Sequence, residues 1–184
     1  MTNQQLVDEL VGNAHGNVER VQEILGAHPE LVNAAASWGE TPIQAAAQMG
    51  DRSMTEYLLS LGAPLDICTA AMLGRGDVVD EMLAADPAQA QATGAHGLPV
   101  LYYPVPHAEQ AIAESLLAAG ADVNAGGGMA TPLHAAVSFN QPAMARWLLD
   151  HGAMADAKDY NGKTPLELAQ EKGLDNLAGI LNSL

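Results

Sequence analysis

Apolar and polar residues recur along the chain in blocks of about thirty residues. The segment 131–136, TPLHAA, returns 33 residues later at 164–169 as TPLELA, and an earlier copy opens at Thr41. A leucine pair, at 58–59 or 148–149, follows 17 residues after the opening threonine, and Gly-Ala comes soon after it. Thr and Pro favour the start of a helix, whereas Gly favours its end. The pattern therefore predicts repeated pairs of short helices.

Aligning these anchors divides the chain into six helix-turn-helix units. Their expected boundaries lie near 5–33, 34–62, 63–87, 88–121, 122–153 and 154–184. The apolar residues are mainly Ala, Leu, Val and Met, with no long Val/Ile/Thr-rich alternation, which favours an all-α fold. Because no single unit can bury its own apolar face, the units should stack into one solenoid domain spanning 1–184.

The chain resembles the ankyrin-repeat family. The resemblance rests on the Thr-Pro-Leu-His-x-Ala turn at 131–136, the Leu-Leu-x-x-Gly-Ala helix end at 148–153 and the Asp-Val-Asn run at 122–124. The short sequence segments at 70–74 and 94–97 are also similar to those of uncharacterised bacterial ankyrin-repeat proteins. The resemblance implies short β-hairpin fingers between the helix pairs. It also implies binding of a partner protein by the fingertips and by the concave face of the first helices.

The middle of the chain departs from the period. The second and third openings, at Thr41 and near Leu65, are only about 24 residues apart, so a finger is missing there. We expect a tight loop and a notch in the row of fingers. The notch either shapes a binding cleft or is a neutral loss. Glycines at 126–128 predict a later finger that is mobile or closely approached by its surroundings.

A second departure covers residues 99–108, where the first helix of the fourth unit belongs. Pro104 and Pro106 remove two backbone donors and restrict the residues before them, so we expect a broken or shortened helix. The surrounding stretch 87–108 has no charged residue and holds Tyr102 and Tyr103. It is either a contact surface or a place where the tyrosines fill the space left by the missing turn.

Carried over by position, the resemblance implies a set of partner-binding residues at fingertips and on the concave side. These are Trp38, Met49, Met72, His96, Tyr102, Tyr103, His107, Met129, Phe139 and Tyr160. Trp38 either offers its indole to a partner or folds back on a neighbouring finger. Trp147, just before a leucine pair, is expected to pack in the core.

Charge excludes several function classes. The formal net charge is −15, and no Lys or Arg occurs between Arg75 and Arg146. Nucleic acids and anionic membranes need clustered basic residues, so neither is an expected partner. The acidic surface either keeps the protein in solution or attracts a basic partner.

The N-terminal segment does not resemble a signal peptide and no apolar run reaches transmembrane length, so we expect a cytoplasmic protein. A single cysteine, Cys68, fits a reducing compartment. A monomer is the default for a solenoid with polar outer units.

Catalysis, cofactors and metals are not expected. The six histidines form no zinc-finger pairing with cysteine and no His-Glu-x-x-His motif. His134 belongs to the turn motif and should bond the neighbouring turn. The leading hypothesis is a non-enzymatic protein-interaction module. The alternative is a small-molecule binder or atypical enzyme with a central pocket near Cys68, Tyr103 and His107.

Overall fold

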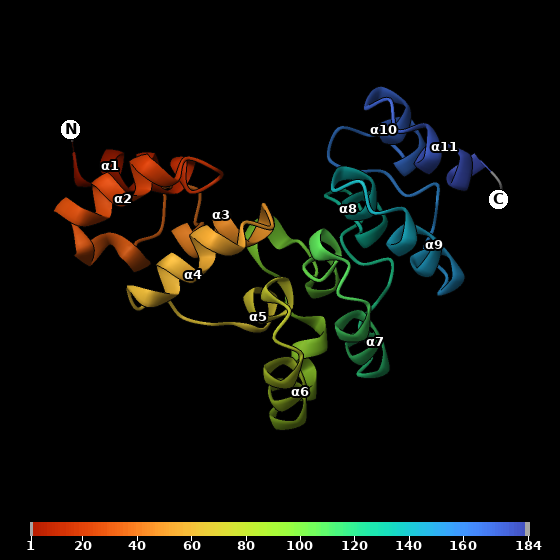
Figure 1. Cartoon of the computed structure of the whole chain (residues 1–184), viewed down its shortest axis with the longest axis horizontal. Helices are drawn as coiled ribbons and strands as arrows, with labels where there is room; N and C mark the ends of the chain where they lie inside the picture. Colours follow the sequence, from red (N-terminus) through yellow and green to blue (C-terminus); the bar gives the residue numbers. More distant parts are fainter. Residues whose placement is uncertain (1, 183–184) are drawn as a thin grey trace.

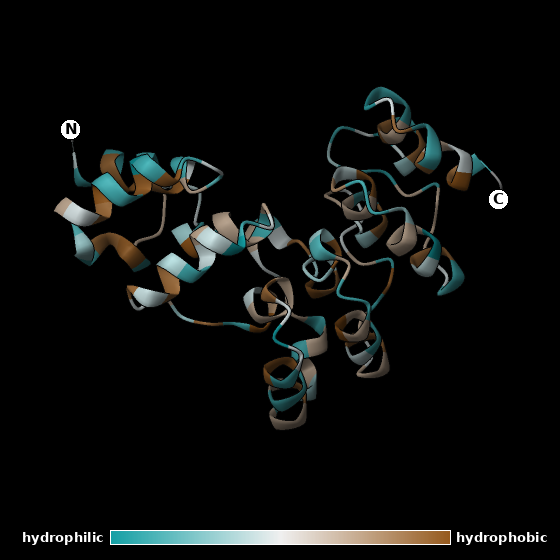
Figure 2. Ribbon diagram, in the orientation of Figure 1, coloured by the Kyte–Doolittle hydropathy of each residue, from teal (hydrophilic) through white to brown (hydrophobic). Residues whose placement is uncertain are grey.

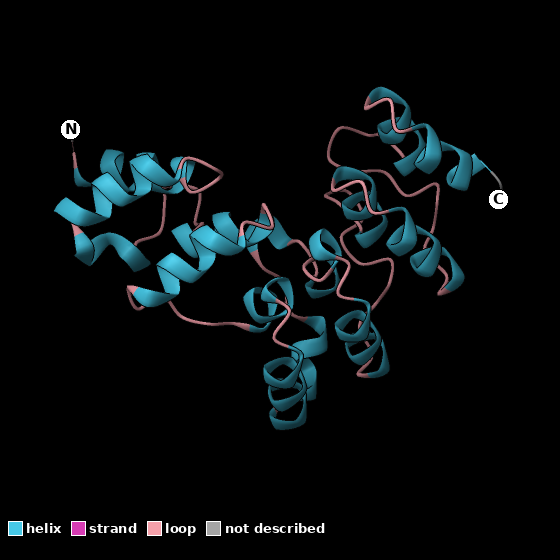
Figure 3. Cartoon of the chain, in the orientation of Figure 1, coloured by secondary structure: helices cyan, strands magenta, loops and turns pink. Residues whose placement is uncertain are grey.

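The computed structural model describes residues 2–182 as a row of short helices joined by loops (Figure 3). The α-helices are α1 (Asn3–Asn13), α2 (Val18–Ala27), α3 (Pro42–Gln48), α4 (Arg52–Ser60), α5 (Ile67–Leu73), α6 (Gly76–Ala85), α7 (Gln110–Ala118), α8 (Pro132–Ser138), α9 (Pro142–Asp150), α10 (Pro165–Glu171) and α11 (Asp175–Asn182). Short 3-10 helices accompany them: η1 (Pro29–Asn33), η2 (Pro87–Gln91), η3 (Ala95–Gly97), η4 (Val100–Tyr102) and η5 (Val105–His107). Residues 2–182 contain no strand, only an isolated bridge between Thr93 and Pro99.

The helices stack as an all-α solenoid, which confirms the expected fold class. Helix α1 packs on α2, α3 on α4, α5 on α6, α8 on α9 and α10 on α11. The first helices also contact one another in sequence, from α1 through α3, α5, η4 and η5 to α8 and α10. In Figure 1 the pairs follow a curved row with α1 and α11 at opposite ends. None of the helices between residues 2 and 182 combines the length and the hydrophobicity of a membrane span.

Thr-Pro openings start three of the first helices, as their sequences predict. At Thr131 and Thr164 the threonine side chain accepts a hydrogen bond from the backbone three residues on, and the side chain there returns the contact. Thr41 and Gln44 form the same reciprocal box at α3. Each box satisfies backbone N–H groups that the first turn of a helix leaves without partners.

Two clusters of buried apolar residues form the core, and they meet at α3. Ala45 and Ala46 belong to the N-terminal cluster, whereas Ala47 belongs to the larger cluster that continues to the C-terminal helices. Hydrophobic and hydrophilic segments alternate along α1 and α6 in Figure 2, as expected of helices with one buried side. Trp147 is buried and stacks on His151, with ring centroids 4.2 Å apart, which confirms its packing role.

The proline-rich segment replaces one first helix with the two 3-10 turns η4 and η5, confirming the predicted break. Leu101 and Val105 are buried there, and both turns pack between α5 and α8. Gly50, at the end of α3, has φ +69°, and a Cβ on it would lie 2.8 Å from Pro106 Cβ. The broken helix is therefore fitted closely against its neighbours.

The fingers are hairpin-like turns. In one of them Ala36 N–H donates to Glu40 O (2.8 Å), and in another Gly94 N–H donates to Leu98 O (2.9 Å). Only the short loop 61–66 joins α4 to α5, so the tight connection is confirmed. The expected notch is closed, however, because the Gly94–Leu98 finger lies against the Ala36–Glu40 finger, with His96 Nε2 3.4 Å from Glu40 Oε2.

The glycine-rich finger is closely approached. Gly126 has φ +85°, and a Cβ there would lie 2.5 Å from Ala130 O and 2.8 Å from Pro99 Cδ. Gly128 N–H also donates to Lys158 O (3.0 Å), which ties this finger to the next. Of the two expectations for this segment, close approach is the one observed at Gly126.

We expect Leu148→Ala to destabilise the fold strongly. Leu148 is fully buried in the larger core cluster, and removing a buried leucine side chain typically costs about 2 to 5 kcal/mol. The measurement is urea unfolding followed by circular dichroism. Leu61→Ala is the matched control, because Leu61 is 40% exposed and should change stability little. Equal effects of the two substitutions would contradict the assigned core.

His134 connects two successive units, as its place in the turn motif predicts. Its Nδ1 lies 2.8 Å from Thr131 Oγ1 and 3.2 Å from Thr131 N, and its Nε2 lies 3.0 Å from Lys163 O. Nδ1 accepts from the Thr131 N–H, and Nε2–H donates to the next finger. Burial lowers the pKa of His134 below its ordinary value of 6.5, so the ring stays neutral.

This lowered pKa predicts a loss of stability in mild acid. The unfolded chain takes up a proton on His134 near pH 6.5, whereas the folded chain takes it up only at lower pH. The contribution of neutral His134 to the free energy of unfolding is therefore complete above pH 6.5. It declines as pH falls below that value, by up to about 1.4 kcal/mol per pH unit. His134→Gln should flatten urea unfolding stability between pH 7 and pH 5.5. Glutamine is a fitting substitute because Gln44 fills the same position at α3.

Candidate functional site

A groove of about 640 Å³ lies on the first-helix side of the row. The ends of α3 and α8, the finger regions on either side of them and α10 supply its lining. The lining residues are Gln48, Met49, His96, Leu98, Tyr102, Met129, Ala130, His134, Ser138, Phe139, Asp159, Tyr160, Asn161, Leu168 and Lys172. Six of these are expected partner-binding residues: Met49, His96, Tyr102, Met129, Phe139 and Tyr160.

Aromatic rings form the base of the groove. Tyr102 makes edge-to-face contacts with Tyr103 and Phe139, with centroids 5.6 and 6.1 Å apart. Burial raises the pKa of Tyr102 to about 12, so its phenol stays neutral at physiological pH. Because the broken helix carries Tyr102 into this position, the second departure from the period shapes the groove directly.

Exposed apolar side chains line the rim. Tyr160 is 70% exposed, and Met49 and Met129 also retain much of their accessible surface. Tyr160 N–H donates to Met129 O (2.9 Å), and Asp159 Oδ1 accepts from the Asn161 and Lys163 N–H groups (2.8 and 2.9 Å). These bonds hold the finger in place, so Tyr160 is presented by a fixed backbone.

The prediction of a contact role is wrong for two residues, Met72 and Tyr103. Met72 is 0% exposed and Tyr103 is 1% exposed, so neither offers surface to a partner in this structure. Met72 is a buried residue of α5, a helix that contacts both η4 and η5. Tyr103 fills the space beneath the broken helix, which is the second of the two interpretations given for the tyrosines.

Two other predicted residues lie outside the groove. Trp38 is 49% exposed, and its Nε1–H donates to Glu40 Oε2 (2.8 Å), so it is held by a residue of its own finger. His107 is exposed, but its Nε2 lies 2.8 Å from Gly50 O and does not face the groove lining. Both stay predictions as contact residues.

Sequence reasoning missed Leu168 and Lys172 of the α10 side. Lys172 lies eight residues after Thr164, as Met49 lies eight after Thr41 and Phe139 eight after Thr131. All three line the groove. The repeat register therefore contained the signal for Lys172, because equivalent positions on stacked first helices face the same side.

The suggested pocket near Cys68, Tyr103 and His107 has no counterpart in the cavities described here. Cys68 is buried in the core, and burial raises the pKa of its thiol far above the ordinary value. A reactive cysteine needs an accessible thiolate, so this environment is typical of a core residue. Tyr103 is buried beside it.

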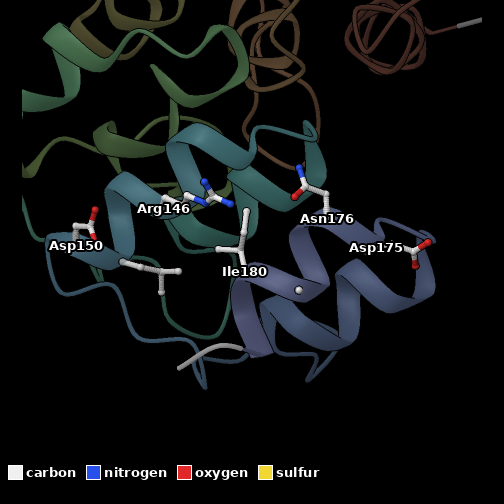
Figure 4. A pocket seen from close by; sticks show the side chains of 7 residues that line it. Arg146, Asp150, Asp175, Asn176 and Ile180 are labelled. Carbon is white, nitrogen blue, oxygen red and sulfur yellow. The ribbon is translucent and has the colours of Figure 1, made fainter.

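A second cavity, of about 580 Å³, lies between α9 and α11 on the side of the second helices. In Figure 4 the Arg146 side chain lies beside Ile180 in the gap, whereas Asp150 and Asp175 lie at its two sides. No aromatic residue lines this cavity. The groove, with its aromatic base, is therefore the stronger candidate for a contact site.

Comparison with known proteins agrees with this geometry. A family model described as "Ankyrin repeats (many copies)" matches residues 116–169, and one described as "Ankyrin repeat" matches residues 38–70. The chain is an ankyrin-repeat protein. Its departures from the repeat, at 61–66 and 99–108, therefore interrupt a known helix-pair architecture.

The ankyrin-repeat chain is similar to several larger proteins. Ankyrin repeat and SOCS box protein 11 of Danio rerio is 43% identical over 63 residues, covering 34% of this chain and 22% of that protein. NF-kappa-B inhibitor alpha of Homo sapiens is 47% identical over 51 residues, covering 28% and 16%. The NF-kappa-B p105 subunit of Gallus gallus is 27% identical over 188 residues, covering 92% and 19%. The chain thus spans less than a quarter of the length of each.

We expect Cys68 to resist alkylation in the folded ankyrin-repeat protein. Its burial and raised pKa leave little thiolate, so iodoacetamide at pH 8 should label it far more slowly than in urea. Mass spectrometry of a labelling time course makes the comparison. Fast labelling of the folded chain would show that the thiol is accessible and would revive the central-pocket hypothesis.

Proposed function

We propose that this ankyrin-repeat protein is a non-enzymatic interaction module that binds a partner protein in the groove between α3, α8 and α10. The supporting observation is the groove itself, where Met49, Tyr102 and Phe139 come together from separate units. Aromatic and methionine side chains are enriched at protein interfaces, and a few buried anchors supply most of the binding energy.

The relatives favour the same class of function. A protein described as an inhibitor of NF-kappa-B acts on another protein, and it shares 47% identity with part of this chain. By that analogy the partner here is also a protein. Analogy of fold alone is weak support, so the proposal rests mainly on the groove.

The chemistry of the groove suggests features of the partner. A bulky apolar side chain would fill the space over Tyr102 and Phe139, flanked by Met129 and Tyr160. The net charge of −15 would attract a segment with basic residues beside that anchor, mainly by raising the association rate. We therefore propose a partner segment that combines an apolar anchor with positive charge.

The buried histidine of the groove, His134, supports a non-enzymatic role. Both ring nitrogens of His134 already have partners, at Thr131 and at Lys163. General-base catalysis would require one of these nitrogens to face a substrate. Cys68 is buried and outside the groove, so it does not serve as the nucleophile there.

A small-molecule ligand is the second candidate, because the groove volume falls in the range of small-ligand pockets. A thermal-shift screen with metabolites tests it, since a ligand that prefers the folded state raises the melting temperature. A saturable shift that Phe139→Ala abolishes would favour this class over the protein-binding module.

The decisive test for the protein-binding proposal is quantitative capture from cell lysate, followed by affinity measurement with the captured partner. We expect Tyr160→Ala and Met129→Ala each to weaken binding by about 5- to 30-fold, the effect of losing 1 to 2 kcal/mol at an interface. Met154→Ala is the matched control, because Met154 is exposed but does not line the groove. If the groove variants bind as well as the control, the partner binds elsewhere.

A further inference from the structure

His15, Glu40 and His96 meet at one edge of the groove, although they come from three separate segments of the chain. His15 follows α1, Glu40 ends the Ala36–Glu40 finger, and His96 lies at the tip of the Gly94–Leu98 finger. Their potential ligand atoms all lie within 4.8 Å of one another. We propose that these three side chains bind one divalent transition-metal ion, with zinc the best match.

Glu40 is the central observation behind this proposal. The residue is 3% exposed, which is unusual for a glutamate, and its Oε1 atom is buried with no hydrogen-bond partner. Its Oε2 atom accepts the hydrogen bond from Trp38 Nε1–H at 2.8 Å. A buried carboxylate oxygen without a partner costs free energy, and buried charges are ordinarily paired or bound to a metal. A cation beside Oε1 supplies the missing partner.

His15 is oriented as a metal ligand would be. Its Nδ1 lies 3.1 Å from Val11 O, so Nδ1–H donates to that carbonyl. The Nε2 lone pair then accepts from Gln48 Nε2 (2.8 Å), with Glu40 Oε1 3.5 Å away. Two acceptors facing each other repel unless a cation or a proton lies between them. Metal-binding histidines commonly donate their second ring N–H to a backbone carbonyl in this way.

The Gln48 amide is the group that an arriving ion would displace. Its Nε2 lies 2.8 Å from His15 Nε2 and donates to that lone pair. Gln48 also lines the groove and is part-buried at the end of α3, so its amide has room to turn toward the groove. The metal would thus exchange one neutral hydrogen bond for a bond between the lone pair and a cation.

The three side chains lie close to the spacing of a tetrahedral ion, with all potential ligand atoms within 4.8 Å of one another. Zinc binds histidine nitrogen and carboxylate oxygen at about 2.0 to 2.2 Å, which places adjacent ligand atoms of a tetrahedron about 3.3 to 3.5 Å apart. His15 Nε2 lies 3.5 Å from Glu40 Oε1, whereas His96 Nε2 lies 3.4 Å from the other carboxylate oxygen, Oε2, so binding one ion through Oε1 requires His96 to move toward it. The His96 side chain is partly exposed, so a small movement of it closes the site. Two histidines and one carboxylate leave a fourth position for water.

The backbone at His96 adds a second reason to assign it a role. Its φ is +54°, a left-handed conformation that is uncommon for residues other than glycine and costs free energy. That conformation places the imidazole at the fingertip, beside Glu40 of the opposing finger. Strained residues of this kind often lie at binding sites.

The site would join the two halves of the core. His15 and Glu40 belong to the part of the chain around the N-terminal apolar cluster, whereas His96 follows Ala90 and precedes Leu98 of the larger cluster. A metal would therefore clamp the first two helix pairs to the middle of the array. This inference does not depend on the protein-binding proposal, and it departs from the expectation that the chain binds no metal.

The test is a titration of the chelator-treated protein with Zn²⁺ alone, by calorimetry, with Co²⁺ absorption as a report on coordination geometry. We expect one ion per chain, a tetrahedral Co²⁺ spectrum and a melting temperature that rises with Zn²⁺ concentration. Loss of a metal's supporting second-shell residue typically costs 10- to 100-fold in affinity. Glu40→Gln and His96→Asn, which remove ligands, should therefore cost at least about 100-fold.

His28→Asn is the matched control. His28 Nδ1 lies 3.3 Å from Glu30 Oε1, so it forms a similar histidine–glutamate pair, but both side chains are exposed. We expect its zinc affinity to equal that of the unmodified chain. His96→Asn keeps the test decisive even if Glu40→Gln fails to fold, because asparagine tolerates positive φ and circular dichroism checks its fold. Absence of saturable zinc binding, or binding unchanged by His96→Asn, would overturn the proposal.

Discussion

The structure depends on one constraint: each helix pair leaves an apolar face that only the next pair can cover. The small alanines within the first helices let those helices approach closely. Ala45, Ala46 and Ala47 show the result, since the three consecutive residues belong to the two core clusters that meet at α3. The departures from the repeat, at 61–66 and 99–108, must therefore still meet this stacking requirement.

The proline-rich segment is the clearest such solution. Pro104 and Pro106 prevent a regular first helix, yet the stack still needs apolar surface at that place. The turns η4 and η5 provide it, with Leu101, Tyr103 and Val105 buried between α5 and α8. The tyrosine next to the buried one then forms part of the groove. Packing and the candidate site thus have one cause, the replacement of a helix by two shorter turns.

Periodic features were predictable from the sequence because stacking repeats the same contacts. The Thr-Pro openings, the broken helix at 99–108 and the bonding of His134 all follow from local rules. Burial in the middle of the array was not predictable, since Met72 occupies a first-helix position expected on the concave side and is nevertheless fully buried. Six of the ten expected contact residues line the groove, and Lys172 was absent from that set although the register points to it.

The cluster of His15, Glu40 and His96 lay beyond sequence reasoning for a different reason. The three residues occupy different positions in their units, so no spacing rule connects them. They meet because the short loop 61–66 omits one finger, and two fingers that a regular array would separate become neighbours. A deletion that looks neutral in the sequence therefore creates a new contact between distant segments.

The groove and this cluster share His96, and Gln48 lies between them. A ligand that moves either side chain changes the surface offered at the other site. Linkage requires any such effect to be reciprocal: whatever factor an ion applies to partner affinity, the partner applies to ion affinity. Because both side chains are polar and partly accessible, they need little rearrangement of the core to move. The groove and the cluster therefore differ in chemistry but share His96 and Gln48. They are neighbours because one finger of the array is missing.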